Sequence, residues 1–218
     1  MKTEAVKRRR YRSDRRQAQA ASTRHEVVAA AQRLFERDGY AATTMAAVAD
    51  EAGVAVETIY RNFAGKAGLI EAVIEAAVAG DAGRAQMAVE DRPAIRRITE
   101  EEDPRQKLAL YAATQPGIHR RAGRLRRALR EAALADSRLE AVHQRLEDQP
   151  YTGLRRFAQH LQEFGALKSG LTVEEARDLL WSINSLAMYE LLVVDRGWSA
   201  ERYQDWITQM MIQSLIGD

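Results

Sequence analysis

Cysteine is absent from the 218 residues of this chain, and proline occurs only four times. Without thiols the protein can form no disulfide, no thiolate metal site and no cysteine nucleophile, so nothing points to an oxidising compartment. The sequence also lacks an apolar run of about 18 residues, and its N-terminus lacks the apolar core of a secretory signal. We therefore expect a cytoplasmic protein that neither crosses a membrane nor is exported.

Patterns typical of catalytic and metal sites are missing as well. The histidines, His25, His119, His143 and His160, show no spacing typical of metal ligands. No Ser-His-Asp grouping and no pair of carboxylates stands out. We expect no metal, no cofactor and no catalytic residues, and therefore no enzyme activity.

The residues that are abundant favour helices. Hydrophobic residues make up 46% of the chain, and it abounds in Ala, Leu, Glu and Arg, which enter a helix at little cost in free energy. Apolar residues recur at helical spacing, and no segment shows the alternation typical of strands. The sequence therefore predicts an all-α fold.

Positive charge is concentrated at the N-terminus. Residues 1–24 contain nine Lys or Arg against Glu4 and Asp14, a net charge of +7, which leaves −5 for residues 25–218 because the whole chain carries +2. Basic arms commonly follow nucleic-acid phosphates, because each neutralised phosphate releases counterions. From composition alone, a solubilising tail that binds no partner is an equally good explanation of this charge. We expect residues 1–21 to form a disordered basic arm.

Two short apolar segments follow a first helix that is predicted to end near Gly39. Thr43 and Thr44 offer hydroxyls that can cap a short helix that must stop at Gly53, and the stretch Val56–Phe63 places two apolar side chains on one face. Two short helices joined by a turn that contains glycine form a helix-turn-helix. The sequence thus predicts a DNA-binding element in this region.

Residues 24–74 resemble the DNA-binding domain of the TetR family of transcriptional regulators. The matching residues, in chain order, are Leu34-Phe35, Asp38-Gly39-Tyr40, Thr43-Thr44, Ala52-Gly53-Val54, Thr58-Ile59-Tyr60, Phe63 and Lys66. The resemblance implies a homodimeric repressor that binds a pseudo-palindromic operator on double-stranded DNA and responds to a small-molecule effector. Ala55, Glu57 and Ala67 depart from the Ser, Gly and acidic residue that are common in the family.

The resemblance also implies which residues contact DNA, and the physics of helix N-termini agrees. Free N–H groups at helix starts bind phosphates, so we expect Thr44 and Lys66, with Tyr60, to hold the DNA backbone. Base edges would meet the start of the helix at Val56, with Arg61 further along able to bind guanine through two hydrogen bonds. The predicted set is Arg24, Thr43, Thr44, Met45, Ala55, Val56, Glu57, Thr58, Tyr60, Arg61 and Lys66.

For the C-terminal half the resemblance implies an effector pocket and pairing through the last two helices. The stretch from Leu179 to Val194 is apolar nearly all round a helix, which requires burial on two sides. One side can face the core and the other a partner, and the alternative is that the last two helices are central in a monomer. The predicted dimer interface comprises Leu186, Tyr189, Leu192, Val193, Tyr203, Trp206 and Met210. The effector candidates are polar or aromatic residues among apolar ones, namely Tyr111, Gln115, His119, Phe157, Trp181, Asn184 and Met188.

The predicted architecture is an N-terminal three-helix helix-turn-helix domain followed by a C-terminal helical ligand-binding and dimerisation domain. Its segments are the basic arm (1–21), the helix-turn-helix (22–66), a connecting helix (67–90), an acidic, proline-containing linker (91–104) and the effector-binding and dimerisation domain (105–218). Within the last, we expect Pro150 to break or kink a helix. Two alternatives remain: a helical small-molecule enzyme or binding protein, and an architectural DNA binder without an effector.

Overall fold

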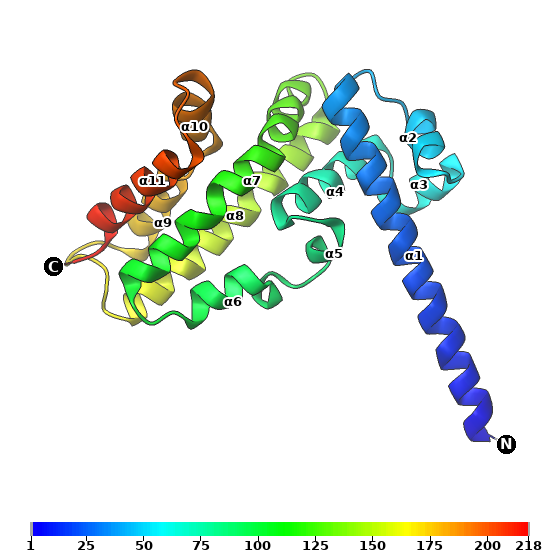
Figure 1. Ribbon diagram of the computed structural model, residues 1–218, viewed down its shortest axis with the longest axis horizontal. Coiled ribbons are helices and arrows are strands. Elements are labelled where there is room, and N and C mark those ends of the chain that lie inside the picture. Colours follow the sequence, from blue (N-terminus) through cyan, green and yellow to red (C-terminus); the bar gives the residue numbers. More distant parts are fainter. Residues whose placement is uncertain (1, 218) are drawn as a thin grey trace.

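The computed structural model describes residues 2–217, with side chains from Ala18 onward. Every regular element in this range is helical, and an isolated bridge pairs Leu167 with Ile216. Figure 1 shows two long helices running side by side through the middle of the molecule, with smaller helices packed at both ends. The predicted all-α fold is confirmed.

The helices fall into three groups along the chain (Figure 1). The N-terminal group is α1 (Lys2–Asp38), α2 (Met45–Ala52), α3 (Val56–Phe63) and α4 (Lys66–Ala79). The central group is α5 (Ala82–Ala85), the 3-10 turn η1 (Val89–Asp91), α6 (Pro93–Glu100), α7 (Pro104–Ala133) and α8 (Ser137–Glu163). The C-terminal group is α9 (Val173–Ile183), α10 (Leu186–Tyr189), the π-helical turn η2 (Glu190–Asp195) and α11 (Ala200–Leu215).

The predicted disordered arm is helical, because α1 begins at Lys2. Residues 2–21 contain neither Gly nor Pro and are rich in Arg, Lys, Ala and Gln, which favour helix. The prediction relied on missing apolar periodicity, which reports burial and not intrinsic helix propensity. Figure 1 shows this part of α1 projecting away from the rest of the molecule, and Met1 lies outside the described residues.

A first hydrophobic core joins the N-terminal helices to one end of the central pair. Its buried members from α1, α3 and α4 include Val27, Val28, Ala31, Leu34, Phe35, Ile59, Phe63, Leu69, Ile70 and Val73. Its members from α7 and α8 are Ala122, Leu125, Leu129, Leu139, Val142 and Leu146. The N-terminal helices therefore share their core with the C-terminal part of the chain.

A second hydrophobic core holds the other end of α7 and α8 against the C-terminal helices. It includes Leu108, Ala112, Leu154, Ala158, Leu161, Val173, Ala176, Leu180, Tyr203, Ile207, Met211 and Leu215. Helices α9 and α11 thus pack on α7 and α8 as one layer.

The predicted linker over residues 91–104 is folded onto the second half of the chain. Helix α6 begins with Pro93 in its first turn and buries Ile98. Lys107 of α7 is fully buried, and its Nζ donates to the carbonyl oxygens of Ile98 and Thr99, both at 3.0 Å. A cation that binds the last carbonyls of a helix satisfies them and offsets the helix dipole. Nothing in the acidic segment itself indicates this cap, because the lysine belongs to the following helix.

Two helices end at other residues than the sequence predicted. Pro150 does not break α8, which continues to Glu163, because the buried face of α8 outweighs the one backbone hydrogen bond that proline removes. The connecting helix ends at Ala79 and not near residue 90, because Gly80 takes a left-handed φ of 104° that ends the helix.

Candidate nucleic-acid interface and sensing site

Helices α2 and α3 are joined by a turn built on Gly53. Its φ of 65° is open to glycine without steric penalty, and its N–H donates to the carbonyls of Ala49 and Asp50 at the end of α2. At the other end of α2, the hydroxyl oxygen of Thr44 accepts a hydrogen bond from the N–H of Ala47 at 3.1 Å. These local contacts set the angle at which α3 follows α2.

Helix α3 buries one face and exposes the other. Ile59 and Phe63 are buried against the first core. Of the predicted DNA contacts on and before this helix, Ala55, Glu57, Tyr60 and Arg61 are exposed, and Val56 and Thr58 are half-buried. A short helix with an uncovered polar face is what a major groove can receive.

Thr43 and Met45 do not present their side chains to solvent. Thr43 is 3% exposed, and its Oγ1 donates to the carbonyl of Gly39 at 2.9 Å. Met45 is buried in the first core. Their assignment as DNA-contacting side chains is corrected, since both support the loop before α2. The sequence could not separate them from Thr44, which caps the same helix from the exposed side.

Arg24 and Lys66 make contacts within the N-terminal group. Arg24 donates to a carbonyl in the last turn of α3 at 3.2 Å, and its guanidinium lies 4.4 Å from the ring centroid of Phe63. The Nζ of Lys66 donates to the carbonyl of Ala41 at 3.2 Å and lies 4.3 Å from the ring centroid of Tyr40. Partial burial of the ammonium lowers the pKa of Lys66. Both cations therefore hold α3 and α4 in position, whatever they contact on DNA.

Two arginines connect α4 to the long helices. Arg121 of α7 donates from Nε to the carbonyl of Ala77 at 2.8 Å, which caps the C-terminal end of α4. Arg145 of α8 forms two hydrogen bonds with the carboxylate of Glu71, at 2.9 and 2.8 Å. Bidentate pairs of this kind fix orientation as well as distance. The connecting helix is thus attached to α8 at Glu71 and to α7 at its C-terminal end.

Four of the predicted effector residues form one hydrogen-bonded cluster in the C-terminal half. Asn184 Nδ2 donates to Tyr111 Oη at 3.0 Å and to Gln115 Oε1 at 2.7 Å. Its other amide atom, Oδ1, lies 3.2 Å from His119 Nε2. Since Oδ1 can only accept, Nε2 of His119 carries the hydrogen. The spacing of Tyr111, Gln115 and His119 at every fourth residue places them on one face of α7.

Burial determines the charge state of this cluster. His119 is 5% exposed, and desolvation lowers its pKa to about 4, although the hydrogen bond with Asn184 opposes the shift. The ring is therefore neutral at neutral pH. Burial likewise raises the pKa of Tyr111. The cluster offers hydrogen bonds without a formal charge.

Aromatic rings surround the cluster. One of them, Tyr203, was predicted to lie in the dimer interface but is buried. Tyr189 stacks on His119 with ring centroids 4.9 Å apart, and Phe157 lies 5.3 Å from Tyr111. Tyr203, predicted to contact a partner subunit, is completely buried, with its ring 5.2 Å from that of Tyr189. The apolar face of α11 is broad, so its periodicity could not tell an inward ring from an outward one.

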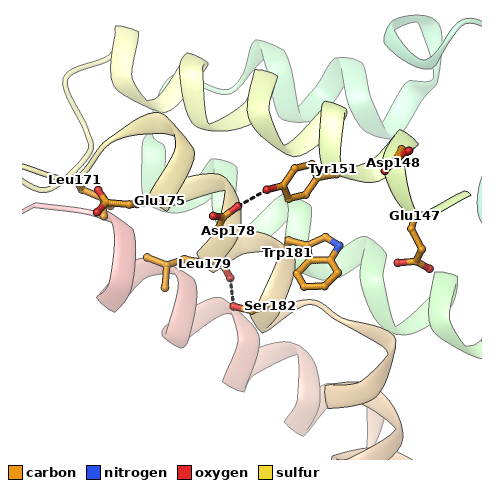
Figure 2. A pocket seen from close by; sticks show the side chains of 9 residues that line it. All are labelled: Glu147, Asp148, Tyr151, Leu171, Glu175, Asp178, Leu179, Trp181 and Ser182. Atoms are coloured by element: carbon orange, nitrogen blue, oxygen red, sulfur yellow. Dashed lines mark hydrogen bonds between the residues drawn. The ribbon is translucent and has the colours of Figure 1, made fainter. Parts of the chain in front are cut away.

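Trp181 lies apart from the cluster, on an open groove of about 930 Å³ between α8 and α9. The groove is lined by Glu147, Asp148, Tyr151, Leu171, Glu175, Asp178, Leu179, Trp181 and Ser182, and Figure 2 shows the hydrogen bond from Tyr151 to Asp178 across it. Tyr151 was not among the predicted residues. Met188, the remaining candidate, is half-buried on α10. The structure thus brings five of the effector candidates together and leaves these two outside.

The side chains of the other predicted interface residues are partly exposed to solvent. Leu186, Tyr189, Leu192, Val193, Trp206 and Met210 are half-buried. Leu191 and Val194 of η2, which are not part of the predicted interface, are 48% and 57% exposed. An apolar surface therefore extends over α10, η2 and α11, and its role as an interface stays a prediction.

None of the helices over residues 2–217 is long and apolar enough to cross a membrane. In the same part of the chain, no group of three or more His, Asp and Glu side chains is placed to hold a metal ion.

Comparison with known proteins identifies the N-terminal helices. Residues 27–73 match the family model described as bacterial regulatory proteins, tetR family. These residues form a TetR-family helix-turn-helix. The curated relative YvkB of Bacillus subtilis (strain 168), named an uncharacterized HTH-type transcriptional regulator, is 42% identical over 52 residues of this TetR-family segment. The matched segment covers 24% of this chain and only 28% of the length of YvkB.

Solved structures of transcriptional regulators share the fold over most of the chain. NalD of Pseudomonas aeruginosa, described as the secondary repressor of the MexAB-OprM multidrug efflux pump, has a TM-score of 0.67 and 19% identity, covering 92% of this chain and 98% of NalD. The regulator FadR from Bacillus subtilis, solved in complex with stearoyl-CoA, has a TM-score of 0.65 and 18% identity, covering 86% and 96%. The predicted architecture of an N-terminal helix-turn-helix and a C-terminal helical domain is confirmed.

Proposed function

We propose that this protein is a DNA-binding transcriptional regulator, a homodimeric repressor whose binding to an operator is changed by a small-molecule effector. The observation that carries the proposal is the TetR-family helix-turn-helix, whose helix α3 exposes Glu57, Tyr60 and Arg61. The matched relative YvkB is named a transcriptional regulator, and the structural neighbour NalD is described as a repressor. A protein with this role acts in the cytoplasm, where the DNA is.

The proposed contacts with DNA divide into positioning and base recognition. Thr44 at the start of α2, Tyr60 and Lys66 would bind phosphates, because the free N–H groups of a helix N-terminus attract anions. Arg61 would bind a guanine edge, and Glu57 could accept from the amino group of cytosine. With so few strong base readers on α3, operator shape would supply part of the specificity.

The basic part of α1 is a proposed second contact with DNA. Residues 1–20 contain eight Lys or Arg, and the helix carries them outward from the helix-turn-helix (Figure 1). Phosphates beside the operator are the partner that this charge favours.

Deletion of residues 1–20 is expected to weaken operator binding and to flatten its dependence on salt. The slope of log K against log salt concentration should become shallower by about 0.9 for each phosphate that the basic residues neutralise in the full chain. The measurement is a DNA titration at several salt concentrations with the full chain and the deletion variant. A slope that does not change would show that the basic residues do not contact DNA.

The proposed route from effector to DNA follows the packing. The polar cluster of Tyr111, Gln115 and His119 lies on α7, and the same helix caps α4 through Arg121. An effector that favours one arrangement of α7 would therefore also move α4 and the recognition helix. In a dimer, the two recognition helices would then leave the spacing of roughly 34 to 36 Å that operator half-sites one turn apart require.

The proposed dimer forms through α10, η2 and α11. Leu191 and Val194 expose much of their apolar surface, and the half-buried Leu186, Tyr189, Leu192, Val193, Trp206 and Met210 lie on the same segments. Burying aromatic and Met side chains of this kind is typical of protein interfaces.

Footprinting on DNA from around the protein's own gene is expected to show a protected pseudo-palindrome. Two helix-turn-helix units related by a twofold axis bind two half-sites, so the protected sequence should mirror that symmetry. Uniform, salt-sensitive coating would instead indicate an architectural DNA binder. No protection at moderate salt would favour a helical enzyme or small-molecule binding protein.

A further inference from the structure

Tyr203 carries a buried hydroxyl without a hydrogen-bond partner among the described side chains. The residue is 0% exposed, and its Oη is one of two buried polar side-chain atoms in the described part of the chain that lack a partner. Buried polar groups in folded proteins nearly always have a partner, so each exception requires an explanation. Burial also raises the pKa of Tyr203, so the hydroxyl keeps its hydrogen and is a donor.

The aromatic rings packed against the ring of Tyr203 carry no charge. The ring of Tyr203 lies 6.2 Å from His119, 5.2 Å from Tyr189 and 6.3 Å from Trp206, measured between centroids. Tyr111 Oη accepts from Asn184, so its own hydrogen remains available as a second donor. The charged groups that act on His119 are Arg126 and Glu190. Each is already in an ion pair, with Glu147 and Arg127 respectively, so neither is free to balance an ion.

We propose that Tyr203 donates a hydrogen bond to the acceptor atom of an uncharged, flat aromatic ligand, whose ring stacks on His119 in place of Tyr189. The hydroxyl can donate and accept, and an acceptor on the ligand would take up its unpaired hydrogen. A neutral ligand is favoured because an ion buried without a counter-charge is strongly disfavoured. A flat ring fits because it would take the place of the ring of Tyr189, which stacks on His119 at an interplanar angle of 29°. A carbonyl, ether or nitro oxygen attached to such a ring fits these conditions.

The segment α10–η2, which is also part of the proposed dimer interface, covers this site, so a ligand enters only when the segment moves. None of the side chains of α10 and η2 is fully buried, although Tyr189 at the end of α10 covers His119. The segment is tethered to α7 by Glu190, whose carboxylate accepts two hydrogen bonds from Arg127 at 2.9 and 2.7 Å. A π-helical turn is less regular than an α-helix and often marks a functional site. Outward movement of this segment would carry the ring of Tyr189 off His119.

The ligand would be the effector, so the regulatory meaning of this site rests on the proposed function, whereas the binding itself can be tested alone. The probes are acetophenone, which has a flat ring and one neutral acceptor, and ethylbenzene, which lacks the acceptor. Their affinities for the full chain are measured by thermal shift and by tryptophan fluorescence, because Trp206 lies beside Tyr203.

We expect the unmodified protein to bind acetophenone more tightly than ethylbenzene, and Y203F to lose this preference. One hydrogen bond to a buried hydroxyl corresponds to about a tenfold difference in affinity. Without probe, Y203F should melt at the same temperature as the parent or higher, because it loses an unsatisfied group. Equal binding of both probes by the parent, or an unchanged preference in Y203F, would overturn the proposal, as would failure of both to bind.

Two further variants complete the test. Y151F removes a hydroxyl that is bonded to Asp178 in the groove between α8 and α9, and it should bind both probes as the parent does. R127Q releases the tether of α10–η2 and should bind acetophenone more tightly, and unchanged binding would overturn the entry route. Footprinting in parallel separates the two proposals: a missing footprint with the acetophenone preference intact would count against the regulator and leave the site standing.

Discussion

Replacement of Gly68 by alanine is expected to destabilise the protein by about 3 kcal/mol or more and to abolish specific DNA binding. A Cβ on Gly68 would overlap the carbonyl oxygen of Phe63, at the end of α3. This neighbour is backbone and cannot rotate away, so either α3 or the start of α4 must shift. Because α3 is the proposed recognition helix, the shift affects both folding and DNA binding.

The matched control is Gly153→Ala. Gly153 also lies within a helix, α8, but a Cβ there meets nothing within 4 Å. Alanine should therefore stabilise the protein by roughly 0.5 to 1 kcal/mol, as it does at unstrained helical positions. Urea denaturation followed by circular dichroism measures both variants, and a DNA titration follows binding. G68A with the stability of the parent would contradict the close approach of α3 and α4.

Acidification from pH 6.5 to pH 4 is expected to remove up to about 3 kcal/mol of stability through His119 alone. The folded protein holds the pKa of His119 at about 4, against 6.5 for a free imidazole. As the pH falls below 6.5, the unfolded chain binds a proton that the folded state does not. The contribution of neutral His119 is therefore complete above pH 6.5 and is lost as the pH approaches 4.

His119→Gln tests this expectation, because glutamine can still donate to Asn184 but does not titrate. The free energy of unfolding of the parent and of H119Q is measured in urea at intervals between pH 7 and pH 4. The variant should lose less stability on acidification than the parent. His143→Gln, on the partly exposed surface of α8, is the control and should follow the parent. The same pH dependence in the parent and H119Q would refute the role of His119.

The helix-turn-helix could be predicted because its determinants are local. Gly53 ends one helix, Thr44 caps it, and the buried residues of α3 recur four apart, so a short window contains the whole pattern. Tyr111 and His119 could be selected for a similar reason, since both lie on one face of α7. Their meeting with Asn184, 65 residues further along from His119, depends on tertiary packing.

The wrong assignments concern residues whose surroundings are set by distant segments. Tyr203 lies on a helix with a broad apolar face, where composition does not decide which side meets the core. Trp181 lines the groove between α8 and α9, and its role toward an effector stays a prediction. Lys107 is a charged residue at a buried position, and the carbonyls at the end of α6 accept hydrogen bonds from its ammonium there. Such pairings cannot be found from the spacing of residues within one helix.

The DNA-binding region shares its hydrophobic core with the long helices α7 and α8. Leu125 and Leu129 of α7, with Val142 of α8, fill the same interior as Ile59 and Leu69 of the N-terminal helices. In cooperative terms, the region matched by the family model is a functional module but not an autonomous folding unit, because part of its interior is supplied from the other half. Strain on α7 would therefore reach the proposed recognition helix through the close-packed side chains of this core.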